Sequence, residues 1–310
     1  MKYALINGVP LDGTETMQPR PGLSILVNGD RIEAIVPAGT EGSDYERIDL
    51  AGGYVMPGLI NLHVHLPASG RPTVKQKDTK KIVRLMTSNA LLRAITFRVC
   101  AGYAKTELLS GVTTLRSVGG IQAVDSYLRD KILSGKAVGP RILAGNMAVS
   151  VPGGHMAGSL AYAMFDRSVT GASETEQYNG RIVMDGIIAC AKACLERGIP
   201  VGLGTDTGCP YITHYDMWRE VYYFHKLCNV SNAFALHTAT LGNARLVGLG
   251  AETGSIEPGK CADLIVTRAN PLEDLKALRH IDLVMGRGNL YRSPKVKKME
   301  KAERELDKFL

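Results

Sequence analysis

The chain has 310 residues, 45% of them hydrophobic and 22% charged, and its formal net charge at pH 7 is +7. This length is enough for one large domain or two modest ones with their own apolar cores. No apolar run reaches the ~18 residues that a membrane span needs, so we expect no membrane partner. The N-terminal segment has no long apolar stretch, which favours a mature cytoplasmic protein over a signal peptide.

The positive charge does not indicate a nucleic-acid partner. Part of it lies in residues 293–310, where Lys and Arg alternate with Glu and Asp. A nucleic-acid surface needs clustered basic residues with interleaved aromatic side chains or a known module, and this segment has neither. We therefore predict that residues 293–310 form a charged, solvated helix.

Both ends of the chain are predicted to be β-rich. Alternation of apolar and polar residues occurs at 2–8, 24–36, 261–269 and 281–292. An Asn28-Gly29 pair favours a tight hairpin turn within the second of these segments. We expect one small sheet domain built from residues 1–52 and 254–292. The alternative is two unrelated terminal hairpins.

The middle of the chain alternates strands and helices, which predicts a parallel sheet and an α/β fold class. The expected strands are 54–66, 112–118, 141–150 and 200–205. The expected helices are 82–104, 121–134, 174–197, 215–227 and 231–249. Ser173 and Glu176 form a capping-box pattern at the start of the third helix, and Gly198 ends it. Residues 53–253 are therefore expected to form the second domain.

His63 and His65, at the end of the first apolar strand, carry the strongest chemical signal. Side chains alternate along a strand, so the two imidazoles face the same way and Val64 faces the other. Two imidazoles at the end of a buried strand can hold one metal ion. Asp206 ends another apolar strand and offers a carboxylate to complete the site. The plain alternative is two histidines on a half-exposed strand.

Together these residues resemble the amidohydrolase superfamily. In that family a His-x-His ends the first strand of a (β/α)8 barrel, an Asp ends the last strand, and these residues bind catalytic divalent metal. Six flanking motifs occur in the family's order: PGLINLHVH (57–65), GVTTLRSVG (111–119), GPRILAGN (139–146), GGH (153–155), GTDTG (204–208) and GSIEPGKCADLIV (254–266). The branch that the chain resembles is imidazolonepropionase-like and includes Xaa-Pro dipeptidases and arginine carboxypeptidases.

The resemblance implies a partial TIM-type barrel beside a β-sandwich domain built from both chain ends. A (β/α)8 barrel needs eight strands and about 250 residues, and only four parallel strands are expected here. By the family's pattern they are the first, second, third and eighth, with the join near residues 161–165. Family members with two metals take a bridging carboxylated Lys and two further His from the missing strands. Lys192 lies on an expected helix and is not assigned that role.

The implied activity is metal-assisted hydrolysis of an amide or peptide-like C–N bond in a small-molecule substrate. Asp206 would bind the metal and also move the proton from water to the leaving amine. Three protein ligands plus water match catalytic zinc, so we expect zinc and at most one ion.

Three further residues are candidates for substrate binding. His155 lies in a Gly-rich loop, His214 follows the eighth strand beside aromatic residues, and Arg116 ends the second strand. The alternative for His155 is an exposed loop histidine, and the alternative for Arg116 is a structural salt bridge.

Two other hypotheses stay open. One hypothesis is that the chain is a non-catalytic remnant that folds by oligomerising. The other is that it is a lactonase-type hydrolase on the same scaffold. Missing strands would leave sheet edges exposed, and we therefore expect a homo-oligomer. Loss of the bridging Lys and the second-metal histidines predicts weak turnover, because removing one oxyanion-stabilising group costs about 10²–10³ in rate.

Overall fold

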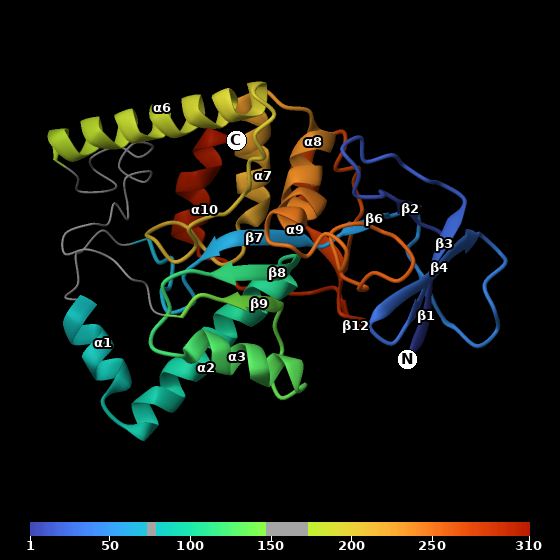
Figure 1. Ribbon diagram of the computed structural model, residues 1–310, viewed down its shortest axis with the longest axis horizontal. Helices are drawn as coiled ribbons and strands as arrows, with labels where there is room; N and C mark the ends of the chain where they lie inside the picture. Colours follow the sequence, from blue (N-terminus) through green and yellow to red (C-terminus); the bar gives the residue numbers. More distant parts are fainter. Residues whose placement is uncertain (73–78, 147–172) are drawn as a thin grey trace.

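The computed structural model describes residues 1–72, 79–146 and 173–310. Figure 1 shows strands from both chain ends gathered in one part of the molecule and a mixed strand-and-helix part beside it. The loop that carries His155 and the expected join near 161–165 lie outside the described residues.

Strands from both chain ends form two sheets around a shared core. One sheet has the order β4-β3-β1-β5 and the other β12-β11-β10-β6-β2. Their bounds are β1 Lys2–Ile6, β2 Val9–Pro10, β3 Leu23–Asn28, β4 Arg31–Pro37, β5 Glu46–Asp49, β6 Tyr54–Pro57, β10 Leu264–Thr267, β11 Ile281–Gly286 and β12 Asn289–Arg292. Leu5 and Ile25 of the first sheet and Met285 of the second belong to one buried apolar cluster. Residues from both chain ends therefore pack into the same apolar cluster.

The middle sheet has three parallel strands in the order β7-β8-β9, namely β7 Leu59–Val64, β8 Val112–Ser117 and β9 Arg141–Ala144. The single strand expected over 54–66 is divided at Gly58 between two sheets. The Gly58 N–H donates to the carbonyl of Asp263, near the start of β10, whereas the Leu59 N–H donates to the carbonyl of Gly111. A Cβ at Gly58 would collide with the side chain of Thr113. Glycine therefore lets the chain cross from one sheet to the other.

The fourth parallel strand expected at 200–205 is not a regular strand, so this prediction was wrong. The segment runs beside β7, where the Leu62 N–H donates to the carbonyl of Leu203 at 3.1 Å. A single parallel bridge joins Val64 to Thr207.

Two asparagine side chains take the place of the strand-to-strand backbone hydrogen bonds that are missing here. The Leu203 N–H donates to Asn243 Oδ1 at 2.9 Å, and the Thr205 N–H donates to Asn61 Oδ1 at 3.1 Å. Backbone donors that would bond a neighbouring strand therefore bond side-chain amides. The segment stays extended next to β7 without continuous backbone pairing.

The helices cover most of the expected segments, with breaks. Their bounds are α1 Thr79–Thr87, α2 Ala90–Leu109, α3 Val124–Leu133, α6 Glu174–Glu196, α7 Met217–Cys228, α8 Asn232–His237, a π-helical turn Thr238–Gly242, α9 Asn243–Leu246, a 3-10 turn Leu275–Arg279, α10 Glu300–Leu306 and a 3-10 turn Asp307–Phe309. The first expected helix breaks at Asn89, whose side chain caps α2 by accepting from the Leu92 N–H at 2.9 Å. No helix in the described part of the chain is long and apolar enough to cross a membrane.

The main core joins the middle sheet to the helices. In Figure 1, α2 and α3 lie below the three strands and α7 to α9 lie above them. Leu59, Leu115 and Ile142 of the strands share one buried cluster with Leu108 of α2 and Val221 of α7. Strand β7 is thus packed between helices on both faces of the sheet.

The C-terminal segment is packed rather than solvated, which corrects the prediction for 293–310. Ala302 and Leu306 on α10 are buried against Tyr211, in the loop before α7. These two residues are four apart and therefore share one helix face. The surrounding charged residues hid this short apolar face in the sequence.

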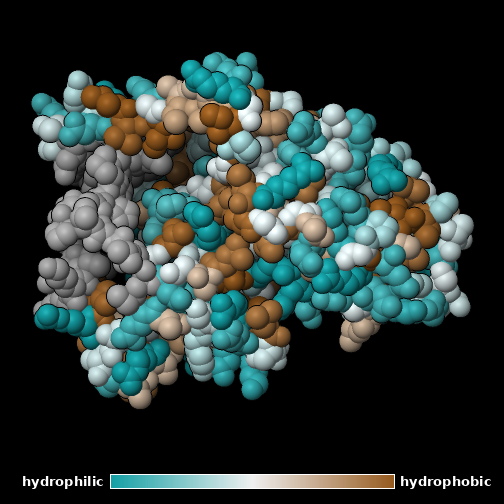
Figure 2. Space-filling model, viewed as in Figure 1, coloured by the Kyte–Doolittle hydropathy of each residue, from teal (hydrophilic) through white to brown (hydrophobic). Residues whose placement is uncertain are grey.

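Helix α6 presents apolar side chains to solvent. Tyr178, Ile182 and Ile187 are 65%, 52% and 52% exposed. Figure 2 shows hydrophobic surface over part of the region where α6 lies in Figure 1. Tyr178 and Ile182 are four residues apart and share one helix face, and exposed apolar side chains of this kind favour contact with another surface.

Candidate functional site

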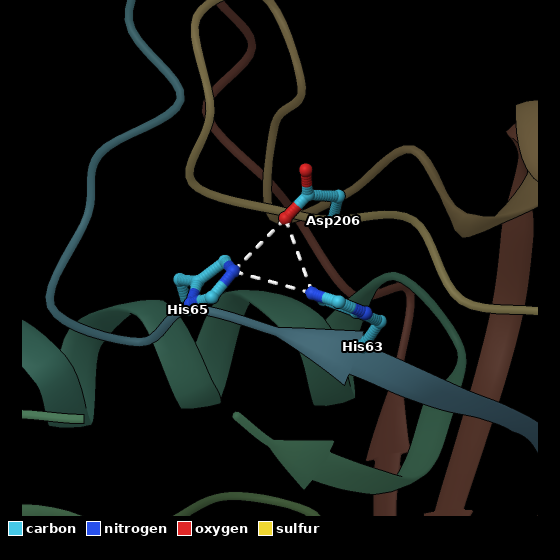
Figure 3. Close-up of side chains that lie close together, drawn as sticks. All are labelled: His63, His65 and Asp206. Atoms are coloured by element: carbon cyan, nitrogen blue, oxygen red, sulfur yellow. Dashed lines mark hydrogen bonds and ion pairs between the residues drawn. The ribbon is translucent and has the colours of Figure 1, made fainter. Parts of the chain in front are cut away.

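Three side chains converge beyond the carboxyl end of β7 (Figure 3). The Nε2 atoms of His63 and His65 are 3.3 Å apart. Asp206 Oδ1 lies 3.3 Å from His63 Nε2 and 2.9 Å from His65 Nε2. In the described part of the chain, no other group of His, Cys, Asp or Glu is close enough to share an ion.

Two glycines allow the Asp206 segment to approach β7 closely. A Cβ at Gly204 would lie 2.7 Å from the backbone nitrogen of His63, and one at Gly208 would lie 2.8 Å from the carbonyl oxygen of His65. Asp206 itself has a φ of 57°, in the left-handed region that non-glycine residues rarely adopt. The GTDTG motif thus bends the chain so that the carboxylate faces the two imidazoles.

The surroundings of Asp206 keep its carboxyl group ionised. Burial raises the pKa of Asp206, but the imidazoles of His63 and His65 and the thiol of Cys209 outweigh it and hold that pKa well below its usual range. Burial and the charge of Asp206 raise the pKa of Cys209 to about 12. Cys209 Sγ lies 3.3 Å from Asp206 Oδ2 and is therefore a protonated donor to the carboxylate at neutral pH.

The donor set fits a divalent metal ion. Ligands about 2.0–2.1 Å from a tetrahedral zinc ion lie about 3.3 Å from one another, close to the separations in this cluster. Asp206 Oδ1 is buried and accepts no hydrogen bond of good geometry from the described residues. The side chains of His63, His65 and Asp206 are 45%, 17% and 29% exposed, so the cluster can be reached from solvent.

His214, a candidate for substrate binding, is buried behind this cluster. Its Nδ1 lies 3.2 Å from Glu107 Oε1, and its Nε2 lies 2.8 Å from the carbonyl oxygen of Ala68. Its ring stacks on Tyr103 with the centroids 4.4 Å apart. Both ring nitrogens therefore face protein atoms rather than a pocket.

Glu107 is a residue that the sequence did not single out. It lies in the last turn of α2 and is 1% exposed. Burial raises the pKa of Glu107, against the opposing effects of His214, Asn61 and Thr207. A glutamate near the end of a helix usually faces solvent, so no local pattern indicated this position.

Arg116 lies in β8 with an exposed side chain, and its Nε donates to the carbonyl of Leu62 at 2.9 Å. This bond ties the side chain to the neighbouring strand β7. A contact between Arg116 and a substrate stays a prediction, as does the role of His155, which lies outside the described residues.

Known proteins resemble this chain in sequence. A family model described as the amidohydrolase family matches residues 177–291. Imidazolonepropionase of Thermoplasma acidophilum is 22% identical, in an alignment that covers 86% of this chain and 88% of that protein. A 5-methylthioadenosine/S-adenosylhomocysteine deaminase of Syntrophobacter fumaroxidans is 37% identical over 26% of this chain and 20% of the relative.

Solved structures resemble its fold. A putative prolidase from Bifidobacterium longum superposes with a TM-score of 0.85 at 24% identity and covers 99% of this chain and 98% of its own. A Xaa-Pro dipeptidase with bound methionine in its active site superposes with a TM-score of 0.76 at 21% identity. That match covers 94% of this chain and 100% of the dipeptidase.

Proposed function

Because this chain belongs to the amidohydrolase superfamily, we propose that it is a metal-dependent hydrolase that cleaves an amide-like C–N bond in a small substrate. The observation that carries the proposal is the convergence of two imidazoles and one carboxylate at the end of a parallel strand. Histidine and carboxylate ligands with an open position are typical of catalytic zinc sites.

Each residue of the cluster has a defined part in this proposal. A bound divalent ion would supply a Lewis acid that activates water near neutral pH and polarises the scissile carbonyl. His63 and His65 would present their Nε2 lone pairs, and Asp206 would present Oδ1 as the anionic ligand. The second carboxylate oxygen of Asp206 would take a proton from the attacking water and return it to the leaving amine.

We also propose that turnover is weaker than in relatives with a complete barrel. The middle sheet has three strands among the described residues, and those residues contain one candidate ligand group. The imidazolonepropionase alignment supports an internal deletion. It runs over 365 residues, and 86% of 310 residues is about 267, so about 98 aligned positions lie opposite gaps in this chain.

A barrel that lacks half of its strands would also fit one alternative, a non-catalytic remnant of the family. Metal content and turnover separate it from the hydrolase. A lactonase would use the same three ligands on a C–O bond, so only its substrates distinguish it.

Metal analysis of the purified protein is the first test. We expect about one zinc ion per chain, which the double variant His63→Ala/His65→Ala should lose. His280→Ala removes an exposed histidine and is the matched control, with unchanged metal content. Hydrolysis is then measured on a panel of N-acyl amino acids, dipeptides and lactones. Unchanged metal content in the double variant would overturn the site, and metal without turnover would favour the remnant.

A further inference from the structure

A buried glutamate–histidine pair contacts the chain next to the candidate metal ligands and has no part in the proposed reaction. Glu107 and His214 are 1% and 2% exposed, and Glu107 Oε1 lies 3.2 Å from His214 Nδ1. Burying either group without the other would cost several kcal/mol, because an isolated charged or polar group loses its hydration. The two side chains therefore depend on each other for their placement.

The histidine of the pair holds the chain that follows β7. His214 Nε2 lies 2.8 Å from the carbonyl oxygen of Ala68. A carbonyl can only accept, so the proton of the imidazole lies on Nε2. The Ala68 N–H in turn donates to the carbonyl of His65 at 3.0 Å. His214 thus fixes the turn that begins at a candidate metal ligand.

The glutamate of the pair reaches both ligand-bearing segments. Asn61, two residues before His63, donates from Nδ2 to Glu107 Oε2 at 3.5 Å. Thr207, next to Asp206, lies close enough to the Glu107 carboxyl group to lower its pKa, and its hydroxyl shares a hydrogen bond with that of Thr205.

Asn61 connects the two segments a second time. Its Nδ2 donates to Thr205 Oγ1 at 2.9 Å, and its Oδ1 accepts from the Thr205 N–H at 3.1 Å. The residues on both sides of Asp206 are therefore joined to β7 through one buried polar network. Fully satisfied networks of this kind permit a single arrangement of their members.

We propose that Glu107 and His214 are positioning residues that set the separation between the end of β7 and the Asp206 segment, and so the geometry of the metal ligands. This inference rests on the proposed function. Groups that orient metal ligands from behind typically change metal affinity 10- to 100-fold when they are removed. Neither residue touches the substrate or the ion in this assignment.

Two substitutions of Glu107 separate its hydrogen bonding from its volume. In Glu107→Gln an amide of nearly the same volume stays within hydrogen-bond reach of His214 Nδ1, and its oxygen can still accept from Asn61. In Glu107→Leu both bonds are lost. We expect the Gln variant to bind Zn²⁺ or Co²⁺ within about threefold of wild type and the Leu variant to bind about 10- to 100-fold more weakly.

Readouts other than activity show whether the effect is positional. Titration calorimetry gives the affinity, and the visible spectrum of the Co²⁺ form reports the ligand geometry, which should change in Glu107→Leu alone. The matched control is Asp263→Leu, which removes a buried carboxylate that accepts from the Thr253 hydroxyl and the Arg287 N–H at the opposite end of β7. We expect it to lower the melting temperature without changing metal affinity.

If Glu107→Leu fails to fold, Thr207→Val removes one link of the network at constant volume and should weaken metal binding about tenfold. Wild-type affinity and an unchanged Co²⁺ spectrum in the folded Leu or Val variant would overturn the inference alone. A loss of metal affinity in Asp263→Leu as large as that in Glu107→Leu would also overturn it. A wild-type protein that binds no metal would overturn the proposed function and this inference with it.

Discussion

The side chain of Asn243 donates from Nδ2 to the backbone carbonyl of Ile60 at 2.7 Å. The same side chain holds the segment that leads to Asp206. Nδ2 donates to the carbonyl of Leu203 at 2.9 Å, and Oδ1 accepts from the N–H of Leu203 at 2.9 Å. One amide at the start of α9 therefore joins strand β7 to the chain that carries the carboxylate.

Replacing Asn243 with Leu should destabilise the protein strongly. The Ile60 carbonyl and the Leu203 N–H would lose their partner, while the Leu203 carbonyl would keep only the Leu62 N–H. Each unsatisfied buried group costs about 1–3 kcal/mol. We expect the free energy of unfolding, measured in urea, to fall by about 3 kcal/mol or more. Asn289→Leu, at an exposed strand end, should change it by less than about 0.5 kcal/mol. A similar loss of stability in both variants would show that the hydrogen bonds of Asn243 do not account for the effect.

Only part of this arrangement could be predicted from the sequence. The Asn28-Gly29 turn was predicted and joins β3 to β4, with Gly29 at a φ of 61°. The start of α6 at Glu174 also matches. Local signals of this kind need no knowledge of distant contacts. His63 and His65 could be selected because strand alternation puts both on one face at the end of β7. Asp206 could be selected from its GTDTG motif, although no regular strand directly precedes it.

The features that escaped prediction depend on contacts between distant residues. Asn243 replaces backbone pairing at Leu203, which is 40 residues away. Glu107 and His214 are 107 residues apart and meet only because α2 packs under the chain that follows Asp206. No spacing rule connects such pairs, so the sequence could give the ligands but not the network that holds them.

Stability should depend on pH through Glu220 in α7. Burial raises the pKa of Glu220 from its ordinary value of 4.5 to about 7. A carboxyl group with a higher pKa in the folded state binds its proton more tightly there, so stability falls as pH rises from 4.5 to 7. Glu220→Gln removes the ionisation and should raise the free energy of unfolding by about 2 kcal/mol at pH 8, with little change at pH 4.5.

Thermal unfolding of Glu220→Gln across this pH range gives the measurement. Glu196→Gln, at an exposed position of α6, is the control and should follow the wild-type profile. A Gln variant with the same pH dependence as wild type would mean that Glu220 ionises normally in the folded protein.

Arg219 should be essential for docking the C-terminal helix. It is 3% exposed, and its Nη2 lies 3.3 Å from Glu303 and 2.7 Å from Asp307, while its Nε lies 3.1 Å from the buried Asp216. Arg219→Met would leave Asp216 buried without its cation, a change that typically costs about 3–5 kcal/mol. We expect the free energy of unfolding to fall by about this amount, and we expect a protease to cleave the segment after residue 295 faster.

The control for this prediction is Arg268→Met, which breaks an exposed ion pair with Asp282. Exposed pairs contribute about 0–1 kcal/mol, so this variant should remain close to wild type. Equal proteolysis of the tail in the two variants would argue against docking through Arg219.

The last prediction concerns assembly. Among the described residues β9 pairs with β8 alone, and the 200–205 segment joins β7 through the hydrogen bond from the Leu62 N–H to the Leu203 carbonyl. Each therefore leaves an edge on the side away from its partner. Unprotected edges template pairing with another chain. We expect two copies to associate with two-fold symmetry, β9 of one against the 200–205 segment of its partner.

Size-exclusion chromatography with light scattering would then give a dimer at micromolar concentration. Leu143→Lys places a charge on β9 and should shift the protein toward monomer, because edge lysines oppose strand addition. Leu133→Lys makes the same change at an exposed position at the end of α3 and should leave the dimer intact. A wild-type protein that stays a folded monomer would mean that the chain covers both edges itself. A dimer that survives Leu143→Lys would place the interface elsewhere, with the exposed Tyr178 and Ile182 of α6 as the next surface to test.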